Sequence, residues 1–187
     1  GRELVGLFSI LCGLLLLLSL ASFDGRDPWL NHVVSGVSTI HNRAGLFGAY
    51  MGGLLYDVLG LAAWVVPAFF CIAGARRILS SPSWDWWRWF GFLLLAVCVA
   101  MAGAAHDLQN LENAAGPANQ AASHGGGLLG HSLYRGLVGG LSVTGATLIW
   151  IFCLLLSLQM LLGFSWFSLI AGTVSRLWEM MVAKAQS

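Results

Sequence analysis

The longest uncharged run in this sequence, Gly136–Ser175, constrains the fold more than any other feature. As one straight helix it would measure about 60 Å, because an α-helix rises 1.5 Å per residue. That is twice the roughly 30 Å hydrocarbon core of a bilayer. The run Ala44–Ala75, interrupted by one charge at Asp57, is also too long for a single span at about 48 Å. Both runs must therefore break, and their glycines offer places for the breaks.

The composition leaves the bilayer as the solvent for this chain. Hydrophobic residues make up 58% of the 187 residues and charged residues only 9%, whereas a soluble domain carries about 25% charged residues. We therefore predict an all-α polytopic membrane protein with four transmembrane helices, at about residues 4–23, 58–78, 88–105 and 143–163. The alternative for the first span is a cleaved signal peptide. A net charge of +1 indicates no nucleic-acid-binding surface.

The basic residues predict the orientation of the spans. Six fall on one side of the predicted membrane, at Arg2, Arg76, Arg77, Arg88, Arg176 and Lys184, and three on the other, at Arg26, Arg43 and Arg135. Because short cytoplasmic loops are enriched in basic residues, both termini and the loop 76–88 are predicted to be cytoplasmic. The loops 24–43 and 106–135 are then external. Residues 164–187 are predicted to form an amphipathic cytoplasmic helix that leaves the last span.

The sequence contains an internal repeat of a glycine-rich segment. Residues 45–60, GLFGAYMGGLLYDVLG, are similar to residues 127–142, GLLGHSLYRGLVGGLS, which follow them at an offset of 82. We interpret each copy as an interfacial or partly inserted (re-entrant) helix that leads into the inward span behind it. The repeat then predicts two helical hairpins in the same orientation, a parallel internal repeat. The alternative is that each copy is simply the glycine-rich start of a transmembrane helix.

The two copies also supply the candidate site residues. Small residues one helical turn apart let neighbouring helices approach closely, so the predicted positions for helix packing and oligomerisation are Gly45, Gly48, Gly52, Gly60, Gly127, Gly130, Gly136 and Gly140. Pro67 is predicted to kink the second span. Asp57 is an ionisable residue near the membrane, and such residues mark functional sites by default. Asp57 and Arg135 are therefore a candidate intramembrane polar pair.

The sequence lacks the motifs of an enzyme active site. It contains no G-x4-G-K-[ST], G-x-S-x-G, H-E-x-x-H or CxxC pattern. No cofactor and no metal are expected for this chain, because the histidines of the predicted external segments lack ligand spacing with a carboxylate or thiol. They are interpreted as solvated loop residues: His32, His41, His106, His124 and His131. The cysteines fall inside the predicted spans as small hydrophobes: Cys12, Cys71, Cys98 and Cys153.

Two blocks of the sequence resemble a known family. SFDGRDPWLN followed by HNRAGLFGAYMGGLLYDVLGLAAWVVPAFFCIAGARRI is similar to the N-terminal membrane region of the FtsK/SpoIIIE DNA translocases. The later GGGLLGHSLYRGLVGGLSVTGATLIW resembles the second glycine-rich approach of that region, and the similarity covers residues 4–180. The first block carries the resemblance in the order and spacing of Asp27-Pro28, Asn42, Gly45, Gly48-Ala49, Leu54-Leu55, Gly60 and Pro67.

The resemblance implies a non-enzymatic four-helix anchor domain, residues 1–180, in the bacterial inner membrane at the division septum. In that family a linker joins the anchor to a hexameric RecA-like ATPase, which uses ATP and magnesium to pump double-stranded DNA during chromosome segregation. The implied partners are the lipid bilayer, further copies of the chain in a hexamer, other division proteins, and double-stranded DNA through the motor only. The motor is absent from this sequence. Because the chain begins without Met and ends within an apolar pattern, we expect it to be a piece of a longer protein.

Two other functions stay open at this stage. The chain could be a small transporter or channel subunit, with Asp57 or Gln159 lining the path. It could also be a membrane-embedded enzyme that uses external histidines such as His41 and His131. The missing motifs, the parallel repeat and the family resemblance favour the anchor over both alternatives.

Overall fold

The computed structural model describes residues 1–31, 39–79, 86–113, 125–163 and 175. Its elements are all helical, and four helical runs are long and apolar enough to cross a membrane. The predicted fold class, an all-α chain with four membrane-spanning helices, is therefore confirmed. In chain order the elements are α1 (Arg2–Ala21), α2 (Gly45–Leu59), the 3-10 helix η1 (Gly60–Trp64), α3 (Val65–Ile78), α4 (Trp86–Asn113) and α5 (Gly127–Leu162).

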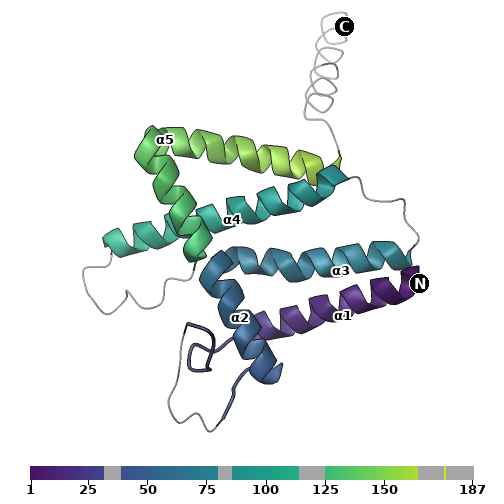
Figure 1. Ribbon diagram of the computed structural model, residues 1–187. Coiled ribbons are helices and arrows are strands. Elements are labelled where there is room, and N and C mark those ends of the chain that lie inside the picture. The colour runs from purple at the N-terminus through teal and green to yellow at the C-terminus, as the bar shows by residue number, and fades with distance from the viewer. Residues whose placement is uncertain (32–38, 80–85, 114–124, 164–174, 176–187) are drawn as a thin grey trace, which may run out of the picture.

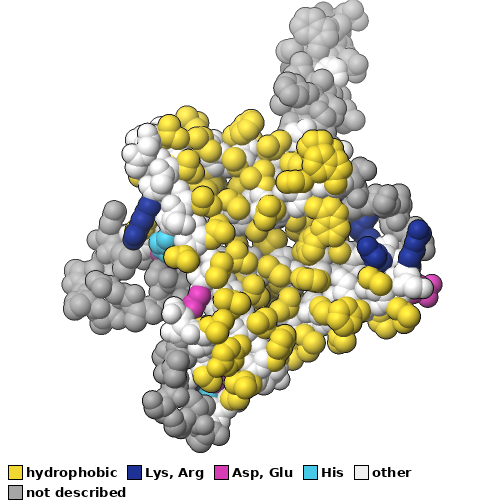
Figure 2. Space-filling view, in the orientation of Figure 1, with side chains coloured by type: hydrophobic (Ala, Val, Ile, Leu, Met, Phe, Trp, Pro, Cys, Tyr) yellow, Lys and Arg dark blue, Asp and Glu magenta, His cyan; other side chains and the backbone are white. Residues whose placement is uncertain are grey.

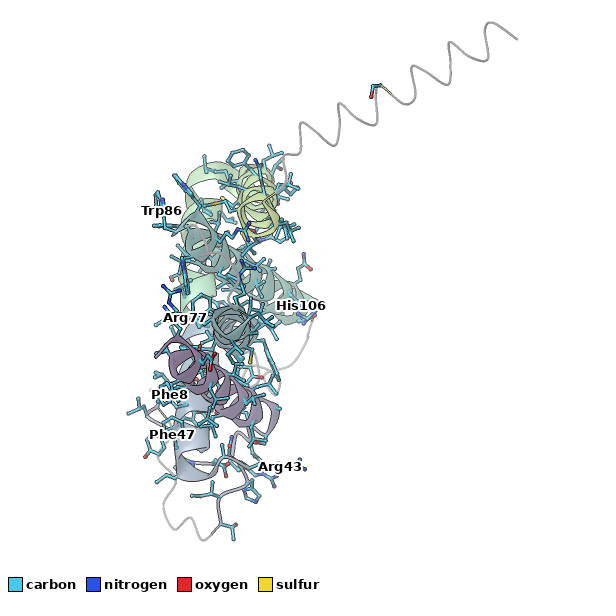
Figure 3. All side chains as sticks on the ribbon, turned by 90° about the vertical axis from the view of Figure 1, so that its right-hand side faces the viewer. Phe8, Arg43, Phe47, Arg77, Trp86 and His106 are labelled. Atoms are coloured by element: carbon cyan, nitrogen blue, oxygen red, sulfur yellow. The ribbon has the colours of Figure 1, made fainter. Side chains whose placement is uncertain are left out.

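The spanning helices form a single layer. α1, α3, α4 and the second half of α5 lie side by side in that order (Figure 1), and a view turned by 90° shows them stacked one above another (Figure 3). Contacts are dense between α1 and α3 and between α4 and α5, and sparse between α3 and α4. The chain is therefore built from a first hairpin (α1, α2, η1, α3) and a second hairpin (α4, α5).

The two ends of the layer differ in chemistry. Arg2 begins α1, Arg76 and Arg77 end α3, and Arg88 lies in the first turn of α4. We call this end the basic end. The opposite end, which we call the kinked end, carries α2, η1 and the first half of α5. Hydrophobic side chains cover the visible face between the two ends (Figure 2), as expected for a surface that lies in hydrocarbon.

The length of α1 matches a bilayer, whereas α4 is longer than one. The 20 residues of α1 give about 30 Å of helix, which is the thickness of a hydrocarbon core. α4 has 28 residues and is about 42 Å long, so it extends some 12 Å beyond the membrane. The predicted external loop 106–135 is wrong at its start, because α4 continues to Asn113, whereas the start of α5 at Gly127 agrees with the helix predicted for the second glycine-rich copy. Of the polar residues in that predicted loop, His106, Asp107 and Gln109 lie on α4, where the apolar pattern had ended.

Both over-long apolar runs break where the backbone adopts positive φ. Gly60 (φ 59°) separates α2 from η1, and Ser142 (φ 63°, ψ 171°) divides α5 into two halves. Gly45 (φ 69°) and Gly127 (φ 58°) stand at the starts of the two glycine-rich helices. Each pair is separated by the predicted offset of 82, so the internal repeat exists in the backbone as well as in the sequence.

Pro67 does not mark the kink that was predicted for it. It is buried in the first turn of α3, two residues after the helix begins at Val65. A first-turn residue has no intrahelical partner for its N–H, so proline is tolerated there without breaking the helix. The direction of the chain changes upstream instead, between Gly60 and Trp64.

The last span ends at a glycine. Gly163 (φ 71°) adopts the left-handed conformation and its N–H donates to the carbonyl of Gln159 at 2.9 Å, which closes α5 at Leu162 as a helix C-cap. The predicted exit helix 164–187 lies outside the described residues, apart from Ser175. The central part of the predicted external loop 24–43 also lies outside them.

The strained break in α5 generates a prediction. Ser142 lies in a region of φ and ψ that is populated almost only by glycine and that costs other residues about 1–3 kcal/mol. We expect Ser142→Gly to stabilise the chain by about 1 kcal/mol in thermal unfolding in detergent, since the matched position in the first hairpin is already Gly60.

A matched control is Ser132→Gly, which places the same substitution inside the regular, exposed first half of α5. Glycine in a helix interior costs roughly 0.5–1 kcal/mol, so this variant should unfold at a lower temperature. Equal destabilisation by both substitutions would contradict a strained Ser142.

Candidate functional site

α2 packs across the end of α1 through its glycines. The Ser19 hydroxyl donates to the carbonyl of Gly48 at 2.5 Å, and a Cβ atom on Gly52 would lie 3.0 Å from that hydroxyl oxygen. The indole of Trp29 occupies the space beside Gly53. Each contact uses room that a side chain would fill, so these glycines let the backbone of α2 approach its neighbours closely.

The glycines of the second copy divide into packed and open positions. Gly130 lies against the backbone of Ala100 in α4, whereas a Cβ atom on Gly136 or Gly140 would meet no atom within 4 Å. The eight predicted packing positions therefore fall into three sets. Gly48, Gly52 and Gly130 pack within the chain; Gly45, Gly60 and Gly127 carry positive φ; Gly136 and Gly140 face away from the chain.

The proposed pair of Asp57 and Arg135 does not form. The carboxylate of Asp57 accepts a hydrogen bond of 2.8 Å from Nε1 of Trp29, and among the described residues it has no ion pair with Arg135, whose side chain is exposed. The ring of Phe23 packs on Trp29, with 5.4 Å between centroids. Asp57 therefore holds the first loop onto α2, and this contact explains the carboxylate without an ion pathway.

A buried carboxylate organises the first loop. Asp27 is fully buried and accepts hydrogen bonds from the backbone N–H groups of His41 and Asn42, each at 2.8 Å. The His41 ring nitrogen Nδ1 lies 3.0 Å from the same carboxylate. Burial by itself raises the pKa of Asp27, but these hydrogen bonds outweigh it and hold the pKa below its ordinary value of 3.8.

Asn42 extends this cluster to the helices. Its side-chain Nδ2 donates to the carbonyl of Ser19 at the end of α1 at 2.8 Å, and its Oδ1 accepts from the N–H of Ala44 at 3.0 Å. Asn42 thus satisfies a free carbonyl of α1 and the backbone that enters α2 at once. We call Asp27, His41 and Asn42 the Asp27 cluster.

The second hairpin contains a counterpart. Asp107, on the extension of α4 and only 6% exposed, accepts a hydrogen bond of 3.0 Å from the N–H of Gly126 at the start of α5. Nε2 of His131 lies 3.6 Å from its carboxylate. We call Asp107, Gly126 and His131 the Asp107 cluster. In each hairpin, then, a buried aspartate fixes the backbone that enters the glycine-rich helix.

The histidines are only partly the solvated residues that were predicted. His41 and His131 each contact a buried carboxylate, and His106 lies 3.1 Å from the side-chain nitrogen of Asn110. His32 and His124 lie outside the described residues. In the part of the chain that is described, no group of three His, Cys, Asp or Glu side chains could hold a metal ion.

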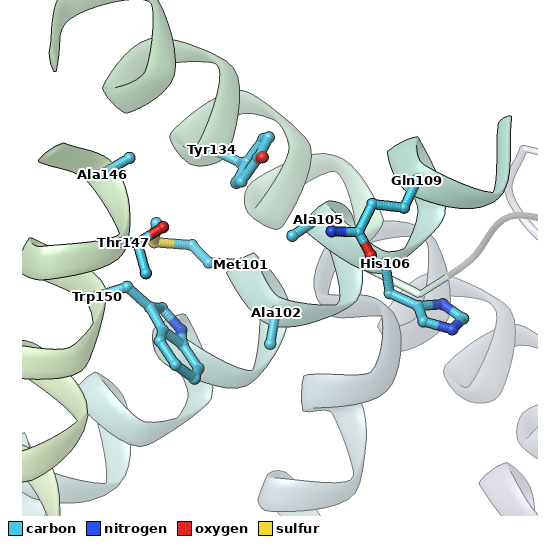
Figure 4. A pocket seen from close by; sticks show the side chains of 9 residues that line it. All are labelled: Met101, Ala102, Ala105, His106, Gln109, Tyr134, Ala146, Thr147 and Trp150. Carbon is cyan, nitrogen blue, oxygen red and sulfur yellow. The ribbon is translucent and has the colours of Figure 1, made fainter. Parts of the chain in front are cut away.

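A pocket of about 290 Å³ lies between α4 and the two halves of α5 (Figure 4). The side chains that give it a polar rim are His106, Gln109, Tyr134 and Thr147, and its floor is apolar, with Met101 and Trp150. Trp150 is itself held by a hydrogen bond of 2.8 Å from Nε1 to the carbonyl of Cys98. None of the lining residues is a carboxylate or a thiol, and the hydroxyl of Thr147 donates to the carbonyl of Val143 at 2.8 Å.

Sequence reasoning missed both aspartate clusters. Asp27 was named only among the residues that carry the family resemblance, and Asp107 was predicted to lie in an external loop. The available signal was positional: each aspartate follows closely after an outward span and precedes a glycine-rich copy. Without the fold, nothing distinguished these two carboxylates from solvated loop residues.

The Asp27 cluster generates a prediction about stability. Asp27→Ala leaves the backbone N–H groups of His41 and Asn42 buried without an acceptor, and such a loss costs about 2 kcal/mol. We expect a lower unfolding midpoint in detergent. The control is Asp24→Ala, which removes the exposed pair between Asp24 and Arg26; surface pairs contribute little. If the two variants unfolded alike, Asp27 would have no special structural role.

The same carboxylate predicts a dependence on pH. Because the pKa of Asp27 is lower in the folded chain than its ordinary value of 3.8, its stabilisation is complete above that value and is lost as pH falls through the folded pKa. We expect the stability of the unmodified chain to decline below about pH 4 and that of Asp27→Asn to decline less steeply. Unfolding curves at several pH values measure both slopes; parallel slopes would show that Asp27 does not contribute.

Comparison with known proteins shows where this architecture occurs. Residues 1–174 match the family described as the 4TM region of DNA translocase FtsK/SpoIIIE. The chain is 31% identical over 170 residues to the DNA translocase FtsK of Pseudomonas syringae pv. syringae, which is 89% of this chain and 20% of the relative. It is 33% identical over 184 residues to the DNA translocase FtsK of Pseudomonas putida, covering 89% of this chain and 21% of that relative.

A shorter match, 37% identical over 66 residues, links the chain to the DNA translocase FtsK of Azospirillum brasilense. No solved structure matches the fold at a significant level. The chain spans about a fifth of the length of the relatives that it matches over most of its own length. With a family match over residues 1–174 and four helices able to cross a membrane, the chain belongs to the family of four-transmembrane regions of the FtsK/SpoIIIE DNA translocases.

Proposed function

We propose that this chain is the membrane anchor and assembly module of a septal DNA translocase that acts in cell division and chromosome segregation. The observation that carries the proposal is the family match, which takes in residues 1–174 of this chain but only about a fifth of each relative. Relatives that are named DNA translocases thus share this membrane region, and most of their length lies elsewhere. An anchor is the role that such a region can perform by itself.

The structure supports a non-enzymatic role for the region. Its polar clusters are used to hold backbone: Asp27 binds the N–H groups of His41 and Asn42, and Asp107 binds that of Gly126. Carboxylates engaged in this way orient loops and helices and do not face a substrate site. Catalysis in the parent protein, with its ATP, magnesium and double-stranded DNA, belongs to the remaining four-fifths of the length.

The basic end supports an orientation. Arg2, Arg76, Arg77 and Arg88 lie at the end of the layer that also holds the N-terminus, and cytoplasmic ends of spans are enriched in basic residues. We place this end in the cytoplasm of a bacterial inner membrane, with both termini on that side. The kinked end, with its aspartate clusters and the extension of α4, then faces outward, where other division proteins would meet it.

No specific observation favours the transporter alternative. It predicted Asp57 or Gln159 lining a path, and the carboxylate of Asp57 accepts a hydrogen bond from Trp29. The backbone carbonyl of Gln159, the other candidate for a path, caps α5 through Gly163, a contact that does not involve its side chain. Assembly remains the better supported role, and a hexamer is the arrangement that a hexameric motor would require.

The proposal is tested in the cells that carry this chain. Residues 1–187 are replaced in the parent gene by an unrelated four-helix membrane segment of the same orientation, and both versions carry a fluorescent protein. We expect the unmodified protein to concentrate at division septa, and the replaced version to be membrane-bound but evenly distributed, with chromosomes trapped at septa. If the replaced version reached septa equally well, the region would supply membrane attachment alone.

A further inference from the structure

The two hairpins meet through a small and unusually close contact at the kinked end. A Cβ atom on Gly127 would lie 2.5 Å from the backbone nitrogen of Gly60 and 2.7 Å from the carbonyl oxygen of Val58. Beside it, the N–H of Leu61 donates to the carbonyl of Gly125 at 2.8 Å. The start of the second glycine-rich helix is thus seated in the break that ends the first one. We call this contact, together with the facing sides of α3 and α4, the hairpin interface.

Small and aromatic side chains complete the hairpin interface. Ala62 of η1 is fully buried, and η1 contacts α4, so a small side chain lets these two segments pack closely. Toward the basic end the ring of Phe69 in α3 packs on two rings of α4, on Trp89 at 4.5 Å and on Phe92 at 5.4 Å between centroids. The interface therefore runs along the length of α3 and α4, although its contacts are sparse between the two ends.

Because of the internal repeat, residues equivalent to those of the hairpin interface also lie at the two outer edges of the layer. At the offset of 82, the break at Gly60 and Leu61 becomes Ser142 and Val143, on the edge formed by α5. Subtracting 82 turns Gly125 and Gly127 into Arg43 and Gly45, on the edge formed by α1 and the start of α2. Since α1 and α5 bound the layer on opposite sides (Figure 1), each chain displays one half of the hairpin interface on each side.

Within the described part of the chain, neither displayed half has a partner at the position that matches the close contact. No atom lies within 4 Å of a Cβ on Gly45 or on Gly140, the counterparts of Gly127 and Val58. Val143 is 57% exposed, against 50% for its counterpart Leu61, so the difference lies in the backbone: among the described residues Val143 has no hydrogen bond to another segment of the kind that Leu61 makes. Figure 3 shows the region of Arg43 and Phe47 at the free edge of the layer, beyond α1.

The lower part of the interface is displayed in the same way. Ile151, the counterpart of Phe69, is 43% exposed, and Leu7, the counterpart of Trp89, is 61% exposed. Thr144, the counterpart of the fully buried Ala62, is exposed as well. Within the chain Ala62 is fully buried, and Phe69 packs on Trp89, which stays 42% exposed; at the edges the counterparts of all three are exposed.

We propose that a second copy of this chain covers each edge, by repeating the hairpin interface between molecules. The α5 edge of one copy meets the α1 edge of the next, so that the carbonyl of Arg43 accepts a hydrogen bond from the N–H of Val143 and Gly45 seats in the break at Ser142. Because both hairpins point the same way, the contact is head-to-tail, and repeated contacts of this kind close into rings or continue as rows. The inference rests on the assembly role proposed above and assigns the surface that carries it.

This assignment changes which residues matter for self-association. Gly48 and Gly130 pack inside the chain, so replacing either by leucine would disturb the fold before it disturbed assembly. The residues that face a neighbouring copy are those of the two edges. A lipid-covered edge or an edge covered by a different division protein are the competing occupants, and both are outcomes of the test.

The test uses cysteine pairs in native membranes that contain the full parent protein. The native free cysteines at 12, 71, 98 and 153 are first replaced by alanine. One variant then carries Ile151→Cys with Leu7→Cys, and a second carries Val143→Cys with Arg43→Cys. A short thiol-specific cross-linker is added, and the products are separated by size. We expect ladders of dimers, trimers and larger species from both pairs.

A matched control pair is Phe152→Cys with Phe8→Cys. Both positions are 66% exposed and follow the first edge pair by one residue, so they point about 100° further round each helix. We expect several-fold less cross-linking from this pair. The pair Phe69→Cys with Trp89→Cys reports the hairpin interface inside one chain and should give an internally linked monomer, which confirms that the reagent reaches such contacts.

Single cysteines separate a head-to-tail contact from a twofold one. Val143→Cys alone or Arg43→Cys alone should give no dimer, whereas membranes that contain a mixture of both variants should give dimers only. Strong cross-linking through one cysteine would overturn the proposal in favour of a twofold interface. Edge pairs that cross-link no better than the control pair would overturn it as well, and would assign the edges to lipid or to another protein.

The outcome is distinguishable from failure of the proposed function. Septal localisation is scored in the same cysteine variants without cross-linker. If the protein concentrates at septa but its edge pairs do not cross-link, the proposed interface is wrong and the anchor role is still supported. Edge pairs that link in protein spread evenly over the membrane would support the interface and count against the septal role.

Discussion

The structure depends on how this chain breaks helices that are too long for a bilayer. A break frees backbone N–H groups, and inside or near hydrocarbon each of them needs a partner from the protein. At Gly60 the partner comes from the other hairpin, because the N–H of Leu61 donates to the carbonyl of Gly125. The break that shortens the second span is therefore also the point at which the hairpins join. Span length, hairpin contact and the position of the glycine-rich helices follow from one backbone feature.

Much of this fold could be predicted from sequence because its signals are local. Uncharged runs set the number of spans, and the offset of 82 set the two-hairpin plan, which the backbone repeats at Gly45 and Gly127 and again at Gly60 and Ser142. Length arithmetic showed that the runs must break. The position of the break in the second span was harder to predict, because proline is the residue type that most often disturbs a helix. Pro67 does not do so here, since it lies in the first turn of α3.

The polar clusters could not be predicted, for a different reason. A carboxylate is costly to bury unless several donors converge on it, and the donors to Asp27 lie 14 and 15 residues further along the chain. Convergence of that kind depends on how the loop returns to the end of α1, which no periodicity records. The extension of α4 could not be predicted from periodicity either. The sequence pattern placed His106 and Asp107 in a loop, yet both lie on α4. There the carboxylate of Asp107 accepts a hydrogen bond from the N–H of Gly126.

The uneven distribution of contacts explains why the edges of the layer matter. Each hairpin packs densely within itself, while α3 and α4 touch sparingly. The hairpins are joined at the kinked end by the backbone hydrogen bond from Leu61 to Gly125 and by the close approach of Gly127 to Gly60. Association of helices in lipid gains little from burying apolar area, because the lipid tails are as apolar as the side chains, and it depends instead on close packing and hydrogen bonds. A contact of that kind is specified by backbone geometry, and the repeat supplies the same geometry twice. A chain that joins its own halves in this way already carries, on its two outer edges, the parts needed to join a further copy.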